Sequence, residues 1–517
     1  MKQKTWIISA LMCAMVIMVC LGVLHLLKEM TENNAPSGTV AEESTDHTEP
    51  EIDFAEEEET KEDIAETGSE EEESDVPVER EEGYYGWKQE LPQIFPSVPE
   101  EVPYEPPRLI LATDLHYQSA QADDGGAAFQ LFVERGDGKV VEYLPELLEA
   151  FMDQVIEEHP SALVLSGDIT MNGEKINHEE LARGLMRVQD AGIPVLIVPG
   201  NHDINNPHAA VYFGEEKAET NPVTPEEFYN IYHMYGYDQA ISRDDASLSY
   251  VYQLDERNRL LMLDTCQYEP KNMVEGQLKV ETLRWADEQL KKAKEDGMNV
   301  LPIGHHNLLA QSRMYTTQCA MNNNGDVIEL FQKYELPLYL SGHLHVQRIR
   351  KHKAEPGAAD DSYGIMEIVT DALSIPPCQY ALLEWKRDGS MEYSTKAVDV
   401  SAWAARTGSQ NPDLLDFEGW SERYIQKLII DQIRGVVKNL GNDVEHSMAE
   451  VYASVYIDYY AGRRIDAKGI RSSKGYRWWE RNMPDSYLLK ELDAMIDDSD
   501  RDNNYMLLPE VNAAAEE

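Results

Sequence analysis

Five short segments of the 517-residue chain end an apolar run with side chains that can bind metal ions. Each contributes carboxylate, amide or imidazole groups, and such mixed oxygen and nitrogen donors suit Mn, Fe or Zn. Each alone is a weak signal, because a Gly-Asp pair or a histidine after a strand is usually an ordinary turn or polar residue. Together they predict one site. The segments are Asp114-Leu115-His116, Gly167-Asp168, Gly200-Asn201-His202-Asp203, Gly304-His305-His306 and Gly342-His343-Leu344-His345.

The spacing inside these segments favours shared ligands. Side chains two residues apart point the same way in an extended chain, so Asp114 and His116 are expected to bind one ion together. By the same spacing, His343 and His345 either share an ion or divide between two. Asp168 has a second carboxylate oxygen with which it can bridge two ions.

The elements that must position these residues alternate between strand-like and helix-like segments from Arg108 to about Ser401, which is typical of an α/β protein. Residues 142–157 and 277–295 have apolar side chains at helical spacing. The later pairs 248–254 with 260–263, and 380–385 with 391–395, favour antiparallel hairpins. Periodicity alone does not predict how the strands pair into sheets.

The order of the five segments resembles the calcineurin-like metallophosphoesterase superfamily over about residues 108–400. Its blocks are D-x-H, G-D, G-N-H-D, a histidine after a strand, and G-H-x-H. The sequence of residues 112–116 and 198–206 is similar to that of the cyclic-nucleotide phosphodiesterase-like branch of this superfamily. That branch includes bacterial members with a helical domain after the catalytic one. The resemblance implies an α/β fold with two facing mixed β-sheets flanked by helices, a four-layer sandwich.

The resemblance also implies a dinuclear metal site of two divalent or trivalent ions, with the choice among Mn, Fe and Zn left open. Two such ions activate a water molecule for in-line attack on phosphorus and neutralise the phosphoryl oxygens. The family pattern assigns the first ion to Asp114, His116, Asp168 and His345. It assigns the second to Asp168, Asn201, His305 and His343.

His202 and Asp203 are the predicted catalytic residues. His202 follows the ligand Asn201 and is expected to contact the leaving group or a transition-state oxygen, with Asp203 orienting it or favouring its protonated form. His306 is expected to support the ligands or face the substrate. Asn307 and the two leucines after it stand where the family usually has a proline, which leaves the pocket shape open. Five weaker candidates either line a substrate pocket or are solvated loop residues: Asn172, Glu174, Asn205, Asn206 and Gln347.

We therefore expect a metal-dependent phosphoric ester hydrolase, and more specifically a phosphodiesterase for small phosphodiesters such as cyclic nucleotides. A phosphomonoesterase is the nearest alternative. A non-catalytic surface interaction protein on the same fold is an alternative of another class. The formal net charge of −50 argues against binding extended nucleic acid, whose phosphates attract Lys and Arg. The five cysteines form no CxxC metal motif. Whether the protein has protein partners is left open.

The two ends of the chain differ from this central part. Lys2 and Lys4 precede an apolar run from Thr5 to Leu27, long enough as a helix to cross a bilayer. We expect a signal anchor over 1–27, which makes the chain a single-pass cell-membrane protein with its catalytic domain outside the cytoplasm. A cleaved signal is the alternative. An acidic and then proline-rich tether follows over 28–107. The catalytic domain is expected over 108–400 and an all-α module over 401–517.

Overall fold

Two large β-sheets form the centre of the computed structural model, which describes residues 104–313, 318–352 and 364–508. The first sheet has the strand order β15 (Tyr505–Leu508), β14 (Met391–Ala397), β13 (Gln379–Trp385), β1 (Arg108–Ala112), β2 (Ala162–Ser166) and β3 (Val195–Val198). The second has the order β11 (Arg348–Lys351), β12 (Met366–Val369), β10 (Leu338–Ser341), β9 (Asn299–Gly304), β8 (Asn258–Leu263), β7 (Tyr250–Gln253) and β6 (Ser242–Arg243). A separate hairpin joins β4 (Ala210–Phe213) to β5 (Glu216–Glu219).

Both large sheets are mixed. β1, β2 and β3 are parallel, as are β8, β9, β10 and β12, whereas β13–β15 and the remaining strands of the second sheet pair antiparallel. Strands that are parallel end at the same edge of a sheet. The expected hairpins are confirmed as β7–β8 and β13–β14, and the expected mixed α/β class is confirmed with them.

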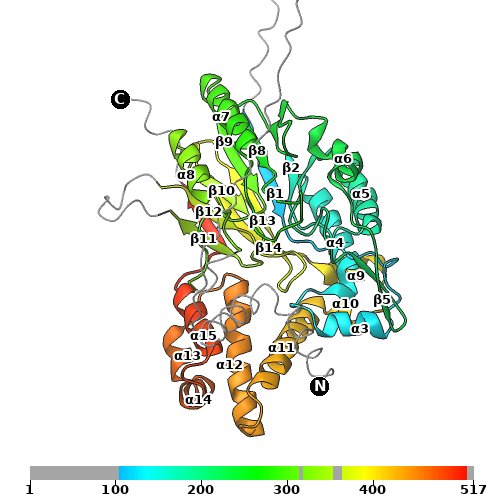
Figure 1. Ribbon diagram of the computed structural model, residues 1–517, viewed down its shortest axis with the longest axis vertical. Helices are drawn as coiled ribbons and strands as arrows, with labels where there is room; N and C mark the ends of the chain where they lie inside the picture. The colour runs from blue at the N-terminus through cyan, green and yellow to red at the C-terminus, as the bar shows by residue number, and fades with distance from the viewer. Residues whose placement is uncertain (1–103, 314–317, 353–363, 509–517) are drawn as a thin grey trace, which may run out of the picture. The chain divides into compact units, whose positions relative to one another are not determined.

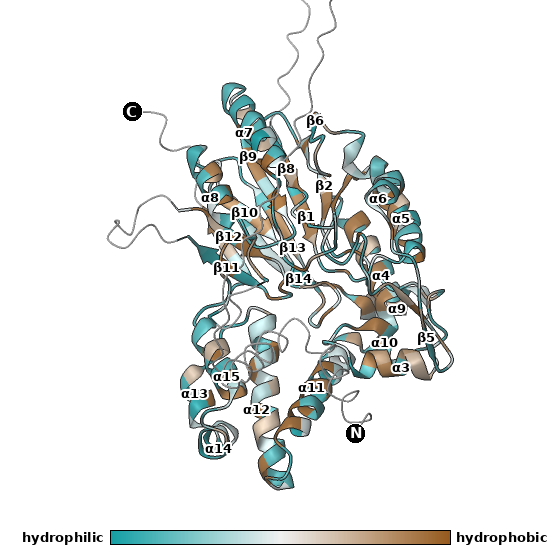
Figure 2. Ribbon diagram, in the orientation of Figure 1, coloured by the Kyte–Doolittle hydropathy of each residue, from teal (hydrophilic) through white to brown (hydrophobic). Residues whose placement is uncertain are grey.

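The side chains of β8 show that the sheets face one another. Leu260 and Met262 belong to the apolar core that also contains β1, β2 and β3, while Leu261 and Leu263 belong to a second core with helices α7 and α8. Alternate residues of a strand point to opposite faces, so one face of the second sheet meets the first sheet and the other meets helices. The central strands are hydrophobic and α7 is largely hydrophilic outside its buried stripe (Figure 2).

Helices lie on both outer faces (Figure 1). The first-sheet core includes apolar residues of α4 and α5, and the second-sheet core includes those of α7 and α8. The predicted helices 142–157 and 277–295 correspond to α4 with the short turn η1 before it, and to α7. The helical elements up to residue 333 are α3 (Ala127–Glu134), η1 (Val141–Tyr143), α4 (Leu144–Glu158), α5 (Lys175–Asp190), α6 (Pro225–Tyr232), η2 (His233–Tyr237), α7 (Val280–Glu295) and α8 (Asn324–Lys333).

The segment after β14 is mainly helical, as expected, and has its own apolar core. Leu344 and Val346 of the catalytic segment belong to this core together with residues of α11, α12, α14 and α15. The helices are α9 (Val400–Thr407), α10 (Pro412–Leu415), α11 (Phe417–Val436), α12 (Asn442–Tyr460), α13 (Ala467–Ser472), α14 (Lys474–Asn482) and α15 (Tyr487–Asp498). The core therefore joins the helices to the turn that follows β10.

One element corrects the expectation of an all-α module. After α15 the chain forms β15, which pairs antiparallel with β14 at the edge of the first sheet. The sequence Tyr505-Met506-Leu507-Leu508 is too short to show a clear period, which is why no strand was expected there. The predicted boundaries at residues 400 and 401 stay predictions.

The predicted membrane anchor and the tether up to residue 103 lie outside the described residues. In the part of the chain that the structure describes, no helix is both long and apolar enough to cross a membrane.

Candidate metal centre

All of the predicted metal ligands follow the ends of β1, β2, β3, β9 and β10, so the sheets bring them together. Asp114, His116, Asp168, His343 and His345 have φ between 45° and 74°, in the left-handed region that costs L-residues about 1 kcal/mol or more each. Asp114 and His116 were expected to point the same way because their segment would be extended. The segment is not extended, so that reason is wrong. Tight left-handed turns, rather than strand alternation, aim these side chains.

The first group of ligand atoms comes from Asp114, His116, Asp168 and His345, which are all buried and lie within 4.8 Å of one another. His345 Nε2 is 3.1 Å from Asp114 Oδ1 and 3.1 Å from His116 Nε2. Asp114 Oδ1 has no hydrogen-bond partner among the described residues. A buried carboxylate oxygen without a donor, facing two imidazole nitrogens, fits a cation at their centre.

The second group comes from Asn201, His305, His343 and Asp168. His305 Nε2 is 3.2 Å from Asn201 Oδ1 and 3.3 Å from Asp168 Oδ2, and His343 Nδ1 is 2.9 Å from Asn201 Oδ1. His305 donates from Nδ1 to the Ser166 carbonyl at 3.0 Å, and His343 donates from Nε2 to the Gln318 carbonyl at 2.8 Å. A carbonyl only accepts, so each ring carries a hydrogen on that nitrogen and directs its other nitrogen toward Asn201, where the lone pair is free once the ring is neutral.

Asp168 lies between the two groups. Its Oδ1 accepts the backbone N–H of His202 at 2.7 Å, while its Oδ2 is 3.3 Å from His305 Nε2 and 4.0 Å from His116 Nε2. One oxygen therefore faces a member of each group. This geometry supports the predicted bridging role, which stays a prediction along with the rest of the ligand set.

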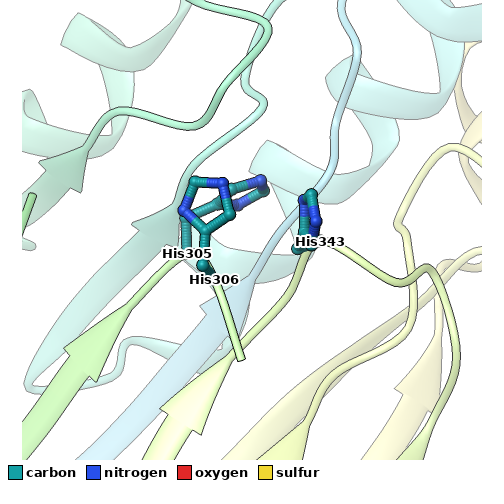
Figure 3. A group of neighbouring side chains, drawn as sticks. All are labelled: His305, His306 and His343. Atoms are coloured by element: carbon teal, nitrogen blue, oxygen red, sulfur yellow. The ribbon is translucent and has the colours of Figure 1, made fainter. Parts of the chain in front are cut away.

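His306 lies beside His305 and His343 (Figure 3). Both of its ring nitrogens have other partners. Thr265 Oγ1 is 2.8 Å from Nδ1, and the Val274 carbonyl is 3.0 Å from Nε2. No nitrogen is left to bind an ion without breaking a buried hydrogen bond. The geometry therefore favours His305 as the ligand and His306 as a support behind it.

His202 is the member of the centre that solvent reaches, with 23% of its side chain exposed. Its Nδ1 lies 2.8 Å from the Met171 carbonyl and 3.1 Å from Asn172 Oδ1. Its ring stands edge-on to His116 with centroids 4.8 Å apart, and its Nε2 is 4.0 Å from Asp168 Oδ2. The ring is thus fixed at one nitrogen and open at the other, beside the two groups.

Asp203 does not orient His202 as expected. Its carboxylate accepts hydrogen bonds from Gly200 N at 2.8 Å, Ile169 N at 3.2 Å, and both the N–H and the hydroxyl of Thr170 at 2.9 Å. These donors lie on the turns after β2 and β3, so Asp203 ties those two turns together. Burial raises the pKa of Asp203 to about 7, and the nearby charge of Asp168 adds to the effect.

The charges of the centre compensate one another. Burial opposes ionisation of Asp114 and Asp168, but the neighbouring histidines outweigh it and hold both pKa values below the usual range. Burial likewise opposes protonation of His305, but Asp168 and Asp114 raise its pKa to about 9. Burial and His305 lower the pKa of His343 to about 4. Without ions, a proton on His305 therefore balances Asp168, and a bound cation has to displace it.

Most of the weaker candidates support backbone rather than line a pocket. Glu174, expected either to line a substrate pocket or to lie on a solvated loop, is buried and accepts hydrogen bonds from the N–H groups of Asn172 and Ala210. Asn205 and Asn206 donate to the carbonyls of Tyr268 and His202, and Gln347 donates to Asn503 O. Adjacency to a ligand in sequence did not distinguish these roles.

Two neighbouring groups were not anticipated from the sequence. Lys139 is buried and ion-paired with Asp137, whose Oδ2 is 4.0 Å from His345 Nδ1. Burial and then Lys139 lower the pKa of His116. Glu367 lies behind the turns of His305 and His343. Nothing near these residues in the sequence indicates a site, because contacts from distant segments place them there.

A cavity of about 590 Å³ lies elsewhere in the part of the chain that the structure describes. It lies where strands of the second sheet begin, lined by Asn258, Asn299 and Leu338, and it contains none of the predicted ligands. This cavity is therefore separate from the metal centre, which the converging ligand atoms identify.

Comparison with known proteins agrees with this geometry. Residues 107–347 match the family model described as calcineurin-like phosphoesterase. The chain carries a calcineurin-like phosphoesterase domain. It is a metal-dependent phosphoesterase, and the resemblance noted from the five motifs is confirmed. Residues 399–502 match a second model, described as the C-terminal domain of cyclic nucleotide phosphodiesterase.

Similar solved structures are distant from this phosphoesterase. A dimetal phosphatase from Danio rerio is 15% identical, with 57% of this chain and 97% of that chain covered and a TM-score of 0.42. A purple acid phosphatase from yellow lupin (Lupinus luteus) seeds is 12% identical, with 57% and 52% covered and a TM-score of 0.39. No curated protein matched the chain. The assignment rests on the family match.

Proposed function

We propose that this phosphoesterase is a phosphodiesterase that hydrolyses small phosphodiesters such as cyclic nucleotides. The observation that carries the proposal is the match of residues 399–502 to the C-terminal domain of cyclic nucleotide phosphodiesterase, beside a complete set of metal-binding side chains. The complete set argues against a non-catalytic interaction protein. The net charge of −50 favours small substrates over extended nucleic acid.

The residues of the two groups would hold two ions, with Mn, Fe and Zn all compatible with the nitrogen and oxygen donors. Such a pair supplies an activated water molecule and neutralises the phosphoryl oxygens. The chain itself fixes the donors: carbonyls hold the His305 and His343 rings in one tautomer, and Asp168 faces both groups.

His202 would act on the leaving oxygen. Met171 O can only accept a hydrogen bond, so the Nδ1 that contacts it carries the hydrogen. In the protonated ring Nε2 also carries a hydrogen, and this nitrogen faces the centre, 4.0 Å from Asp168 Oδ2. His202 can therefore donate a proton to a departing alkoxide while Met171 and Asn172 keep its orientation.

A comparison of paired substrates tests the proposal. The protein is supplied in turn with Mn, Fe or Zn and assayed on bis(4-nitrophenyl) phosphate, 4-nitrophenyl phosphate and a 3′,5′-cyclic nucleotide. We expect a higher kcat/KM on the diesters than on the monoester. A preference for the monoester would establish the phosphomonoesterase alternative, and no turnover with any metal would refute both.

We also propose that the apolar run from Thr5 to Leu27 anchors the enzyme in the cell membrane with its catalytic domain outside the cytoplasm. The support is the length of the run and the two lysines that precede it, since positive charges favour the cytoplasmic side. The acidic tether would then hold the phosphoesterase away from the bilayer.

A further inference from the structure

Glu367 is a buried carboxylate that joins two of the metal-binding turns. It lies in β12, between β11 and β10 of the second sheet, and none of its surface is exposed. Its Oε1 accepts hydrogen bonds from Leu308 N at 2.8 Å and Ser341 Oγ at 2.6 Å. Its Oε2 accepts from Leu309 N and Gln311 Nε2, both at 2.6 Å. Four hydrogen bonds to one buried carboxylate hold the groups that donate them firmly in place.

The four donors come from two different turns. Leu308, Leu309 and Gln311 follow His305 at the end of β9, whereas Ser341 ends β10 and comes two residues before His343. A direct link adds to this bridge, because Asn307 Nδ2 donates to Ser341 Oγ at 3.0 Å and to Gly342 O at 2.9 Å. Asn307 and the two leucines, which replace the proline usual in the family, thus supply the contacts to β10 and β12.

The two turns carry both histidines of the second group. Their rings have centroids 5.2 Å apart, and both approach Asn201 Oδ1, at 3.2 Å from His305 and 2.9 Å from His343. Transition-metal bonds to nitrogen and oxygen are about 2.0–2.2 Å long and tolerate shifts of only a few tenths of an ångström. The separation of the two turns therefore decides how well an ion fits there.

We propose that Glu367 is a positioning residue that sets the distance between His305 and His343 and thereby the affinity of the second metal position. The proposal rests on the metal centre described under the proposed function. The proposal predicts an effect on the second metal position alone, because other contacts hold His345 of the first position in place. His345 is flanked by Leu344 and Val346 in the core of the C-terminal helices, and Gln347 N donates to Tyr460 O at 2.9 Å.

The substitution Glu367→Gln tests the role with little change of shape. The new amide group would present N–H hydrogens to two of the four donors. Whichever oxygen it replaces, one backbone N–H of the turn after His305, that of Leu308 or that of Leu309, would lose its acceptor. Glu491→Gln is the matched control, because Glu491 is also a buried carboxylate, accepts a hydrogen bond from Tyr452 and belongs to α15.

The measurement is ion-by-ion affinity for Zn and for Mn, by elemental analysis and competition with a chelator, on the full chain. We expect two ions in the unaltered protein and in Glu491→Gln, and one retained ion with at least tenfold weaker binding of the other in Glu367→Gln. Two ions bound as tightly in Glu367→Gln as in the control would overturn the proposal. Fewer than two in the unaltered protein would overturn the metal centre itself.

A milder variant keeps the test decisive if Glu367→Gln does not fold. Ser341→Ala removes one donor from Oε1 and leaves Glu367 in place. The second ion should bind severalfold more weakly, with the first unchanged. Equal affinities for both ions in Ser341→Ala and the unaltered protein would then count against the proposal. The unfolding temperature of each metal-free variant shows whether a lost ion merely reflects lost stability.

Discussion

Replacing His202 with alanine should separate metal binding from chemistry in this phosphoesterase. The ring is outside both groups of ligand atoms, so His202→Ala is expected to retain two ions. What it removes is a nitrogen that faces the centre at 4.0 Å from Asp168 Oδ2, on a ring held by Met171 O and Asn172 Oδ1. The loss should therefore appear in kcat.

The size of the loss depends on the leaving group. A positioned acid contributes about 10²–10⁴ in rate, or roughly 3–5 kcal/mol, when a poor leaving group such as a ribose alkoxide departs. A nitrophenolate needs little protonation, so its rate should fall less than about tenfold. Asn172→Ala should have an intermediate effect. It removes one of two acceptors at Nδ1 while Met171 O remains, and one hydrogen bond is worth about 1 kcal/mol, or roughly fivefold.

The assay compares kcat for a cyclic nucleotide and a nitrophenyl diester, with metal content measured on the same samples. His446→Ala is a matched control, since this histidine is half exposed on α12 and pairs with Glu450, away from the predicted ligands. Equal losses on both substrates with two ions retained would show that His202 holds the phosphoryl group instead of protonating the leaving oxygen. Unchanged rates on both would refute the catalytic role.

Four further predictions follow, three from the structure and the last from the sequence. Asp168→Ala should lower the metal content and nearly abolish turnover, because its Oδ2 faces both groups; two tightly bound ions by elemental analysis would contradict the bridge. Metal affinity should rise with pH up to about 9, because a cation displaces the proton that Asp168 holds on His305, and calorimetry in buffers of different ionisation enthalpy should detect its release. Burial raises the pKa of Glu491 from 4.5 to about 8, so between these pH values the unfolded chain has lost this proton while the folded chain keeps it. The free energy of unfolding should therefore fall as pH rises from 4.5 to about 8, by at most roughly 4–5 kcal/mol. Denaturant unfolding of Glu491→Gln should lack this fall. Protease added to intact cells should release the catalytic domain by cutting the tether, whereas a mature protein beginning just after Leu27 would point to a cleaved signal.

The sequence predicted which side chains lie together at the centre better than it predicted the backbone that aims them. Each ligand segment is local, so Asn201 or Asp168 can be recognised from its own neighbours and from the apolar run before it. Left-handed turns at Asp114 and His116 have no such local signal, because aspartate and histidine adopt them only when surrounding structure requires it.

Contacts between distant segments account for most of what was missed. Asp203 faces Thr170 and Gly200 rather than the adjacent His202, and Glu174 is buried rather than solvated. Glu367 reaches its partners from another strand of the second sheet. Strand lengths and helical periods were visible in the sequence, but the order of strands, and hence these neighbours, follows from packing that periodicity does not encode.

The return of the chain to β15 makes the helical segment an excursion from one sheet edge. It leaves after β14 and comes back beside it, with Thr395 donating to Asn504 both through its backbone N–H, at 3.1 Å, and through its hydroxyl, at 2.7 Å. The helical segment therefore begins and ends beside β14, where hydrogen bonds hold both of its ends. Opening the chain in the short connection between α13 and α14, as in a circular permutant, would leave the pairing of β15 with β14 intact. Deleting β15 would release the end of the helical segment and expose β14 as a new edge of the sheet.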